Sequence, residues 1–280
     1  MSLAIRPLHP TLGAEVAGID LGALGDEALG EILAAWRRHG LLVFRDQDLS
    51  PAAQLQFSRF LGSLDLAPAF DAERSALEGH PEIAVVSNIK RGGVAIGGLG
   101  DGELAWHSDM TYVPAPPIGC VLHARELPAG GGGDTFFLDL RAAWDDLPVA
   151  LRVVTVGARL FHDRAYTSAG TPRLDSAAGD GVWHPVRFDD PLSGHSALFL
   201  GRQRGGRAIL ASGERGDALL AALWAEADRP PHIYRHAWQP GDVVLWNNIA
   251  TMHRRDAFAS TDRRLLHRTQ IRNLDRRWQA

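Results

Sequence analysis

The second half of the chain is a succession of short apolar segments separated by Gly, Pro and Asp turn residues. Only one helical pattern interrupts the series, with an apolar stripe across residues 216–228. Many short strands with regular turn signals are typical of all-β sandwiches and jelly rolls. We therefore predict strands at 152–161, 183–188, 196–200, 207–211, 232–238, 242–247 and 264–272.

The first half adds helices and buried strands to this pattern. Residues 26–39 carry apolar side chains at helical spacing and are followed by a glycine, which predicts a helix that packs beside a buried strand at 41–44. Ser50 and Pro51 form a cap and first turn for a second helix ending near residue 62. Further predictions are strands at 83–87 and 118–124 and a helix at 140–152 capped by Asp139.

The expected fold class is mainly β, a jelly roll with flanking α-helices. No internal repeat or linker-like segment divides the chain, so residues 1–280 are predicted to form a single domain. All-β domains of this length are routine.

Composition excludes several classes of protein. A net charge of −4 and a pI near 6.3 give no general attraction to nucleic acid or to an anionic membrane. The single cysteine, Cys120, excludes an internal disulfide and Cys-rich metal sites. Neither a signal peptide nor an apolar run of membrane-spanning length is recognisable, so a cytoplasmic protein without membrane contact is expected.

The most informative motif is the His107-x-Asp109 pair, with His253 far downstream. Side chains two residues apart point to one face of an extended strand, so His107 and Asp109 are expected to converge. A second histidine from a distant strand would complete two nitrogens and one carboxylate around a metal. That set is the facial triad of non-haem Fe(II) oxygenases, which leaves positions open for other ligands.

Two other motifs are weaker indications of a binding site. His232 and His236 are four residues apart, but Pro230 and Pro231 and the β-prone residues around them favour a strand over a zinc-binding helix. The glycine-rich segment 91–102 lacks the spacing of a phosphate-binding loop and precedes the His-Asp motif. It is interpreted as a loop beside an active site.

Several ordered blocks resemble the taurine/chlorophenoxyacetate dioxygenase family of Fe(II)- and 2-oxoglutarate-dependent enzymes. They occur at matching intervals over essentially the whole chain, which makes the set more specific than any single motif. The blocks are GLLVFRDQ (40–47), WHSDMTY (106–112), GGDTFF (132–137), HPVRF (184–188), MHRRDAF (252–258) and RRLLHRTQI (263–271).

The resemblance implies a double-stranded β-helix fold and an iron site. His107, Asp109 and His253 match the family's metal ligands and catalytic centre. The retained Asp109 favours hydroxylation of an unactivated C–H bond over halogenation, because related halogenating enzymes lose this carboxylate. Dioxygen and 2-oxoglutarate are the implied co-substrates, with succinate and CO2 as products. Asn247 stands where many relatives carry an aspartate, which would alter hydrogen bonding behind the ligands.

The resemblance also assigns a 2-oxoglutarate pocket. Thr135 and Arg264 match the pair that holds the distal carboxylate, Arg268 matches a second arginine near the co-substrate and substrate head groups, and Trp246 matches an aromatic lining residue. A guanidinium can bind a buried carboxylate through two parallel hydrogen bonds. Arg264 and Arg268 lie four apart on a predicted strand and share one face. The remaining arginines of this region are predicted to form an exposed basic edge: Arg254, Arg255 and Arg263.

The expected substrate is a small organic molecule other than taurine. Ala67 stands where taurine enzymes carry a histidine for the sulfonate, and Glu103 and Asp101 favour a neutral or amine-bearing substrate. A substrate carboxylate bound by Arg268 is the alternative. The predicted substrate-pocket residues are Phe70, Asn88, Glu103 and Tyr112. Relatives are commonly dimers or tetramers, so a homo-oligomer is expected.

Two other classes of function remain open on the residues alone. A jelly-roll protein that binds a small acid without redox turnover would not need both Asp109 and Arg264. A mononuclear metal hydrolase would need a general base near a metal-activated water, and would not need an arginine dedicated to a dicarboxylate.

Overall fold

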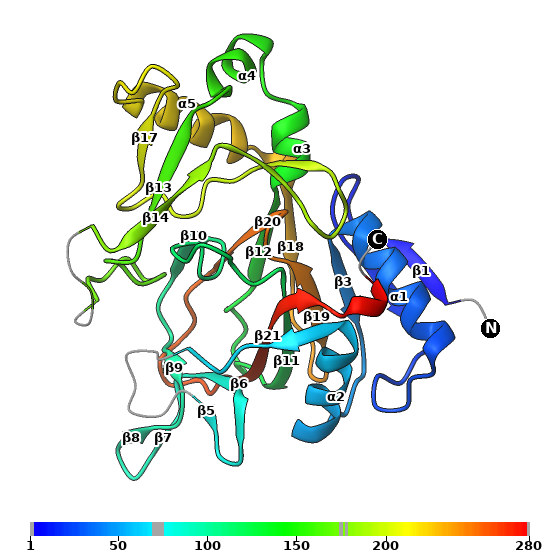
Figure 1. Cartoon of the computed structure of the whole chain (residues 1–280). Helices are drawn as coiled ribbons and strands as arrows, with labels where there is room; N and C mark the ends of the chain where they lie inside the picture. Colours follow the sequence, from blue (N-terminus) through cyan, green and yellow to red (C-terminus); the bar gives the residue numbers. More distant parts are fainter. Residues whose placement is uncertain (1–2, 69–75, 174–175, 177–178, 279–280) are drawn as a thin grey trace.

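The computed structural model describes residues 3–68, 76–173, 176 and 179–278. A large mixed sheet crosses the molecule in the order β1-β2-β3-β19-β11-β21-β6-β5 (Figure 1). Its last long strand, β21, lies between β11 and β6 and also pairs with β4, while β9 pairs with β6. The strands are β1 (Ala4–Pro7), β2 (Ala14–Ala17), β3 (Leu41–Phe44), β19 (Val243–Asn247), β11 (Gly119–Glu126), β21 (Leu265–Leu274), β6 (His80–Ser87), β5 (Ala76–Leu77), β4 (Gly62–Leu64) and β9 (Gly98–Leu99).

A smaller sheet packs against one face of the large sheet. Its order is β10 (Leu104–His107), β20 (Thr251–Arg255), β12 (Thr135–Asp139) and β18 (Ile233–His236). Phe137 of the small sheet contacts Trp246 of the large sheet, with ring centroids 5.7 Å apart. These rings belong to a buried apolar cluster that includes Leu122, Val244 and Leu266 of the large sheet. The space between the sheets is therefore a packed core.

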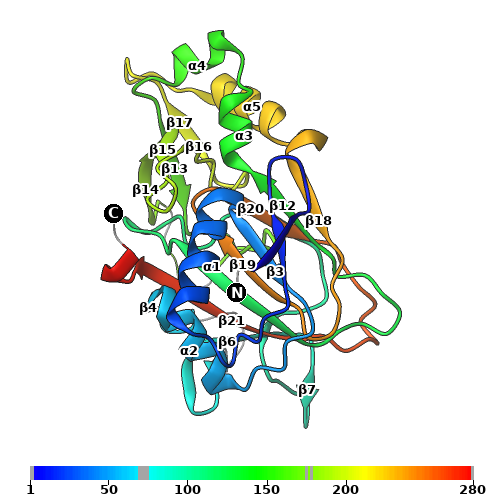
Figure 2. The same ribbon diagram turned by 90° about the vertical axis from the view of Figure 1, so that its right-hand side faces the viewer.

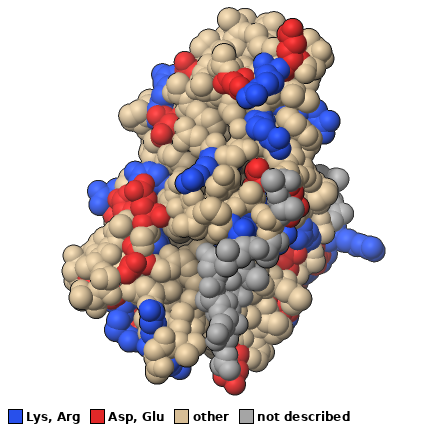
Figure 3. Space-filling view, turned by 90° about the vertical axis from the view of Figure 1, so that its left-hand side faces the viewer, with Lys and Arg blue, Asp and Glu red and all other residues tan. Residues whose placement is uncertain are grey.

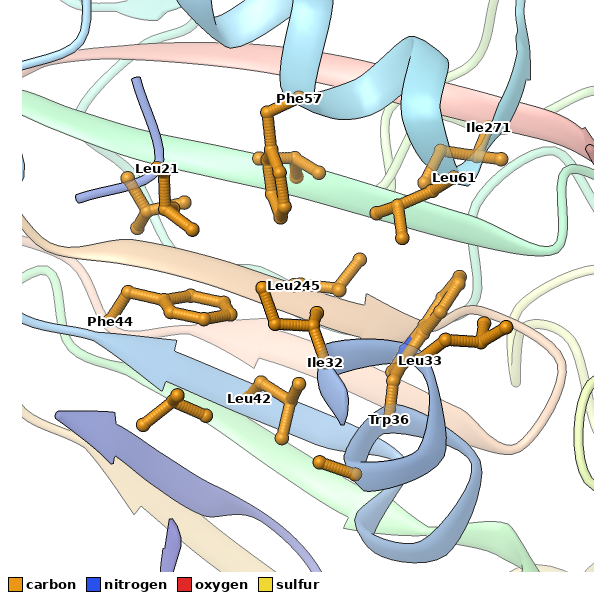
Figure 4. Close-up of a cluster of buried hydrophobic side chains, with 14 of the residues drawn as sticks. Leu21, Ile32, Leu33, Trp36, Leu42, Phe44, Phe57, Leu61, Leu245 and Ile271 are labelled. Atoms are coloured by element: carbon orange, nitrogen blue, oxygen red, sulfur yellow. The ribbon is translucent and has the colours of Figure 1, made fainter. Parts of the chain in front are cut away.

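Two helices cover the opposite face of the large sheet. They are α1 (Asp26–His39) and α2 (Pro51–Leu61), and Figure 2 shows both lying over the strands. Ile32 and Trp36 of α1 and Phe57 of α2 meet Phe44 and Leu245 in the cluster drawn in Figure 4. Ser50 caps α2, because its hydroxyl accepts a hydrogen bond from the Ala53 N–H at 3.1 Å. The predicted helices at 26–39 and 51–61 and the strand at 41–44 are confirmed.

A third group of elements gathers at one end of the molecule (Figures 1 and 2). Its buried core includes Leu160, Leu198, Leu223 and Trp224. The elements are the helices α3 (Leu140–Asp145), α4 (Val149–Thr155) and α5 (Asp217–Ala227), and the strands β13 (Arg159–Asp163), β14 (Gly181–Pro185), β15 (Arg187–Asp189), β16 (Ser196–Leu198) and β17 (Arg207–Ile209). The remaining short elements are a hairpin of β7 (Lys90–Arg91) and β8 (Val94–Ala95), and the 3-10 turns η1 (Pro230–His232) and η2 (Arg276–Trp278).

The prediction of one helix at 140–152 followed by a strand from 152 is wrong. Pro148 separates α3 from α4 and stands at the start of the second helix. Proline has no N–H for the helical hydrogen bond and disfavours helical geometry in the residue before it, so the first helix ends. Asp139 caps α3 as predicted, accepting a hydrogen bond from the Arg141 N–H at 3.0 Å. The mainly β fold class is confirmed.

Charged side chains are mixed on the face shown in Figure 3. Lys and Arg are interspersed with Asp and Glu among the residues described on this face. Within the described ranges, no helix has the length and hydrophobicity needed to cross a membrane.

Candidate metal centre and adjoining pockets

His107, Asp109 and His253 converge between the two sheets. Each offers a ligand atom, and these atoms lie within 4.8 Å of one another. The two histidines are direct cross-strand neighbours on β10 and β20, with ring centroids 4.1 Å apart. His107 Nε2 lies 3.9 Å from Asp109 Oδ1. The three groups are therefore close enough to share one ion.

Asp109 reaches this position from a turn, so its predicted placement on a strand face with His107 is wrong. Strand β10 ends at His107, and the chain then turns through Met110, whose φ is 52°. Ser108 anchors the turn because its hydroxyl donates to the Thr251 carbonyl at 2.8 Å. The turn brings the carboxylate back toward the imidazoles.

The protonation states suit a divalent metal. Burial lowers the pKa of His107 well below its ordinary value and that of His253 to about 4, so both imidazoles are neutral near pH 7. Burial opposes ionisation of Asp109, but nearby charges, Arg268 foremost, lower its pKa below the ordinary value. His107 Nδ1 lies 2.7 Å from the Ala105 carbonyl, so that nitrogen carries the proton and Nε2 offers its lone pair. Two neutral nitrogens and one carboxylate are the donor set of a non-haem Fe(II) site.

A first pocket adjoins His253 and is closed by apolar side chains. The predicted co-substrate residues Thr135, Trp246, Arg264 and Arg268 all line it. Arg264 is only 2% exposed, and burial, reinforced by Arg255, lowers its pKa to about 9. Its guanidinium stays charged near pH 7. The other lining residues are Val86, Leu99, Leu104, His107, Leu122, Phe137, His253 and Arg255.

The presence of Arg255 in this pocket overturns one prediction. Arg255 was expected on an exposed basic edge, but it is 4% exposed and lies opposite Thr135 in the β12–β20 pairing. Arg254 faces the other way, stacks over the Phe136 ring at 3.8 Å and pairs with Asp256. The difference follows from strand alternation, because Arg255 lies two residues after His253 and shares its face.

A second pocket lies on the Asp109 side of the metal centre. Tyr112 lines it as predicted, together with Arg268, which borders both pockets. Two arginines that sequence reasoning missed, Arg173 and Arg202, line it as well. Their guanidiniums lie 5.4 and 5.6 Å from the Tyr112 ring centroid. The remaining lining residues are Pro68, Leu99, His107, Met110, Thr167 and Ser168.

The other predicted substrate residues do not gather there. Glu103 is exposed, and Asn88 lines neither of the two pockets at the metal centre. The Asn88 side chain instead donates to the Asp262 carbonyl at 2.7 Å and accepts from the Arg264 N–H at 3.0 Å. Asn88 therefore holds the chain that carries Arg264. Phe70 lies outside the described residues.

A buried asparagine pair, Asn247 and Asn248, lies at the end of β19. Asn247 donates to Asp190 at 2.7 Å and accepts from the Ile249 N–H at 3.0 Å, so it shapes the turn toward β20. Asn248 bonds to the main chain of Asp109.

His232 and His236, the alternative zinc pair, do not form a metal site, since His232 pairs with Asp146 at 3.0 Å.

Residues 4–270 match the sequence profile described as taurine catabolism dioxygenase TauD, TfdA family. The chain belongs to this family. The resemblance drawn from the ordered sequence blocks is therefore confirmed.

Several curated proteins resemble the chain over most of their length. One is the (S)-phenoxypropionate/alpha-ketoglutarate-dioxygenase of Sphingobium herbicidovorans, 32% identical over 95% of this chain and 94% of the relative. Another is the alpha-ketoglutarate-dependent 2,4-dichlorophenoxyacetate dioxygenase of Cupriavidus pinatubonensis, which is 33% identical over 96% of this chain and 97% of the relative. The alpha-ketoglutarate-dependent sulfate ester dioxygenase of Pseudomonas putida is 31% identical over 90% and 84%.

Solved structures of similar proteins share the fold. A taurine dioxygenase from Burkholderia xenovorans has a TM-score of 0.77 and 28% identity, covering 97% of this chain and 89% of that one. The structure of AAD-2 in complex with Mn(II) and N-oxalylglycine has a TM-score of 0.78 and 26% identity, covering 98% and 99%.

Proposed function

We propose that the protein is an Fe(II)- and 2-oxoglutarate-dependent dioxygenase that hydroxylates an unactivated C–H bond of a small organic molecule. The observation that carries this proposal is the buried His107, Asp109 and His253 cluster beside a pocket that ends in a buried arginine, Arg264. The named activities of the relatives support it. Succinate and CO2 are the products expected from 2-oxoglutarate.

Each group of residues has a distinct part in this mechanism. The triad would hold Fe(II) and leave positions for 2-oxoglutarate and O2, and the bound metal would supply the oxygen chemistry. Arg264 and Thr135 would bind the distal carboxylate and so fix the orientation of the co-substrate. Phe137 and Trp246, which are 0% and 1% exposed, exclude water from that pocket.

We propose that the two packed sheets are the double-stranded β-helix of this family and that residues 1–280 form one domain. The small sheet and strands β19, β11 and β21 of the large sheet enclose the proposed site, which supports that assignment. A homo-oligomer, dimer or tetramer, and a cytoplasmic location remain predictions of the sequence analysis.

The proposed substrate is an organic anion such as a carboxylate or a sulfate ester, in place of the neutral or amine-bearing molecule expected from Glu103. Arg173, Arg202 and Arg268 line the second pocket, while Asp109 is its only acidic residue among those described. A buried arginine is stabilised by an anionic partner, and a bound metal would add further positive charge. The relatives named for phenoxypropionate and sulfate esters support the same class.

Anaerobic addition of Fe(II) and 2-oxoglutarate tests the reaction class. The wild-type protein should develop the visible charge-transfer band, and His107→Ala and Asp109→Ala should lack it. His195→Ala, at an exposed histidine, is the matched control and should retain the band. Absence of the band from the wild-type protein would favour a binding protein or a hydrolase over the dioxygenase.

Substrate-stimulated succinate release in air tests the substrate class. Phenoxy acids, sulfonates and sulfate esters should be compared with their neutral methyl esters and with amines. Anions should stimulate release, and Arg202→Met should raise the substrate KM about 10- to 100-fold with the 2-oxoglutarate KM unchanged. Stimulation by neutral molecules or amines, and by no anion, would contradict the assignment.

A further inference from the structure

Arg255 is a buried cation that has no role in the mechanism proposed above. It is the last residue of β20, opposite Thr135 on β12 and Leu104 on β10. Strand alternation places it on the same face as His253, toward the space between the sheets. It lines the pocket that also holds Thr135 and Arg264.

The hydrogen-bond partners of Arg255 account for only part of its guanidinium. Nη2 donates to the carbonyls of Leu99 and Gly102, at 3.0 Å for Leu99. Nε and Nη1 are buried and have no hydrogen-bond partner among the described residues. Among the described residues, no carboxylate forms an ion pair with the Arg255 side chain. Burial lowers the pKa of Arg255 to about 10, and the negative charge of Asp101 partly opposes this effect.

Arg264, which directly precedes β21 of the large sheet, is in a similar state. Its Nη2 donates to the Gly133 carbonyl at 3.3 Å, and its Nε is buried without a partner among the described residues. The positive charge of Arg255 helps to lower the pKa of Arg264. The nearby Asp134 partly opposes this effect, but it is engaged by Arg235 at 2.6 Å.

Three arginines line this pocket, and Arg268 pairs with Asp109 at 3.0 Å. No carboxylate among the lining residues offsets the buried charges of Arg255 and Arg264, and burying unpaired charges is costly. Leaving buried N–H donors without acceptors adds to the cost. An anion with several acceptor oxygens would offset both effects, and a carboxylate presents two oxygens with about four lone-pair positions. The pocket therefore offers a carboxylate more unsatisfied N–H donors than a single arginine would.

We propose that Arg255 is a second guanidinium for the distal carboxylate of 2-oxoglutarate, acting together with Arg264 and Thr135. The proposal rests on the dioxygenase function above and adds a binding residue to it. Nε and Nη1 of Arg255 supply donors to the carboxylate, while Nη2 keeps its bonds to Leu99 and Gly102. The same side chain thus fixes the glycine-rich segment that borders the pocket at Leu99.

Comparing two co-substrates separates carboxylate binding from a purely structural role. 2-Oxobutyrate has the 2-oxo acid group but lacks the distal carboxylate. Both acids would be titrated anaerobically into the Fe(II)-loaded protein, with the charge-transfer band as the readout. Arg255→Met should raise the Kd for 2-oxoglutarate about 10- to 100-fold and leave the Kd for 2-oxobutyrate unchanged.

Two further variants complete the experiment. Arg254→Met changes the neighbouring arginine, which faces away from the pocket, and should alter neither Kd. Arg255→Lys retains the positive charge but lacks the planar guanidinium that can bind a carboxylate through two hydrogen bonds. It should raise the Kd for 2-oxoglutarate by less than Arg255→Met does, and it serves as the test if Arg255→Met does not fold.

The outcomes distinguish this proposal from the one on which it rests. Equal weakening of both acids by Arg255→Met or Arg255→Lys would show that Arg255 only tethers the Leu99–Gly102 segment, and an unchanged Kd for both would exclude any role in binding. Either result overturns the inference. A wild-type protein without a band for either acid would instead overturn the dioxygenase function.

Discussion

The side chain of Asn248 makes two hydrogen bonds to the main chain of Asp109. Its Oδ1 accepts from the Asp109 N–H at 2.7 Å, and its Nδ2 donates to the Asp109 carbonyl at 2.9 Å. A third bond, from Nδ2 to the Pro117 carbonyl at 2.9 Å, fixes the amide itself. Asn248 is fully buried, so these bonds have no competition from water. It holds the turn in which the carboxylate ligand sits.

Replacing Asn248 by Ala should therefore weaken metal binding. We expect a loss of about 10- to 100-fold in Co(II) or Fe(II) affinity, the range typical of residues that orient metal ligands. Titration of the metal without co-substrate measures this directly. Asn273→Ala, the same change at an exposed asparagine, is the control and should have no effect. A folded Asn248→Ala protein with wild-type metal affinity would contradict the positioning role.

Cys120 should be chemically silent in the native protein. It is fully buried with its Sγ 3.5 Å from Asp109 Oδ2, and burial, followed by the Asp109 charge, raises the pKa of the thiol well above its ordinary value. The thiolate is the reactive form, so a buried neutral thiol resists modification. A thiol reagent such as DTNB should detect no cysteine before unfolding and one afterwards. Rapid labelling of the native protein would contradict this placement.

His162 should make the protein sensitive to mild acid. Burial, followed by the charge of His184, lowers its pKa to about 3. The unfolded chain takes up this proton below about pH 6.5, whereas the folded chain does not until near pH 3. Stability contributed by neutral His162 is therefore complete above pH 6.5 and is lost as the pH falls toward 3.

Urea unfolding at two pH values measures this effect. The free energy of unfolding should fall by about 1.4 kcal/mol per pH unit for this residue below about pH 6. His162→Gln cannot take up the proton, so its stability should fall less between about pH 7 and 5. His195→Gln changes an exposed histidine and should leave the wild-type slope intact. An identical slope in His162→Gln would count against a buried neutral imidazole.

Gly62 and Gly30 should respond in opposite ways to the same substitution. A Cβ at Gly62 would lie 1.9 Å from the Asn273 carbonyl oxygen, where β4 meets β21, whereas a Cβ at Gly30 in α1 meets nothing within 4 Å. Gly62→Ala should cost about 1–3 kcal/mol or more, and Gly30→Ala should stabilise the protein by about 0.5–1 kcal/mol. Chemical denaturation measures both values. Equal effects at the two positions would contradict the close approach of β4 to β21.

The sequence was a good guide where side-chain periodicity decides the outcome. Arg264 and Arg268 were predicted to share one face of a strand at 264–272. Arg268 lies in β21 and Arg264 directly before it, and both line the pocket. The same rule would have placed Arg255 beside His253, but its charge favoured an exposed assignment. In Arg255 the alternation of the strand outweighs the general preference of arginine for the surface.

The sequence was a poor guide where distant segments decide the outcome. Asp109 turns back toward the histidines because of Asn248, which is 139 residues away. Arg202 reaches the second pocket because its backbone forms an isolated antiparallel bridge with His107. Neither contact has a periodic or spacing signal in the chain. Only the assembled structure shows them.

The interleaving of the two sheets has a consequence for biosynthesis. The triad comes from β10, its following turn and β20. Arg264 directly precedes β21 and Arg268 lies within it, and β21 must enter between β11 and β6. An emerging polypeptide that has not yet delivered β21 lacks both arginines and leaves the large sheet divided. Iron capture should therefore follow the emergence of β21, and the reactive centre should not form on the ribosome before that strand has been synthesised.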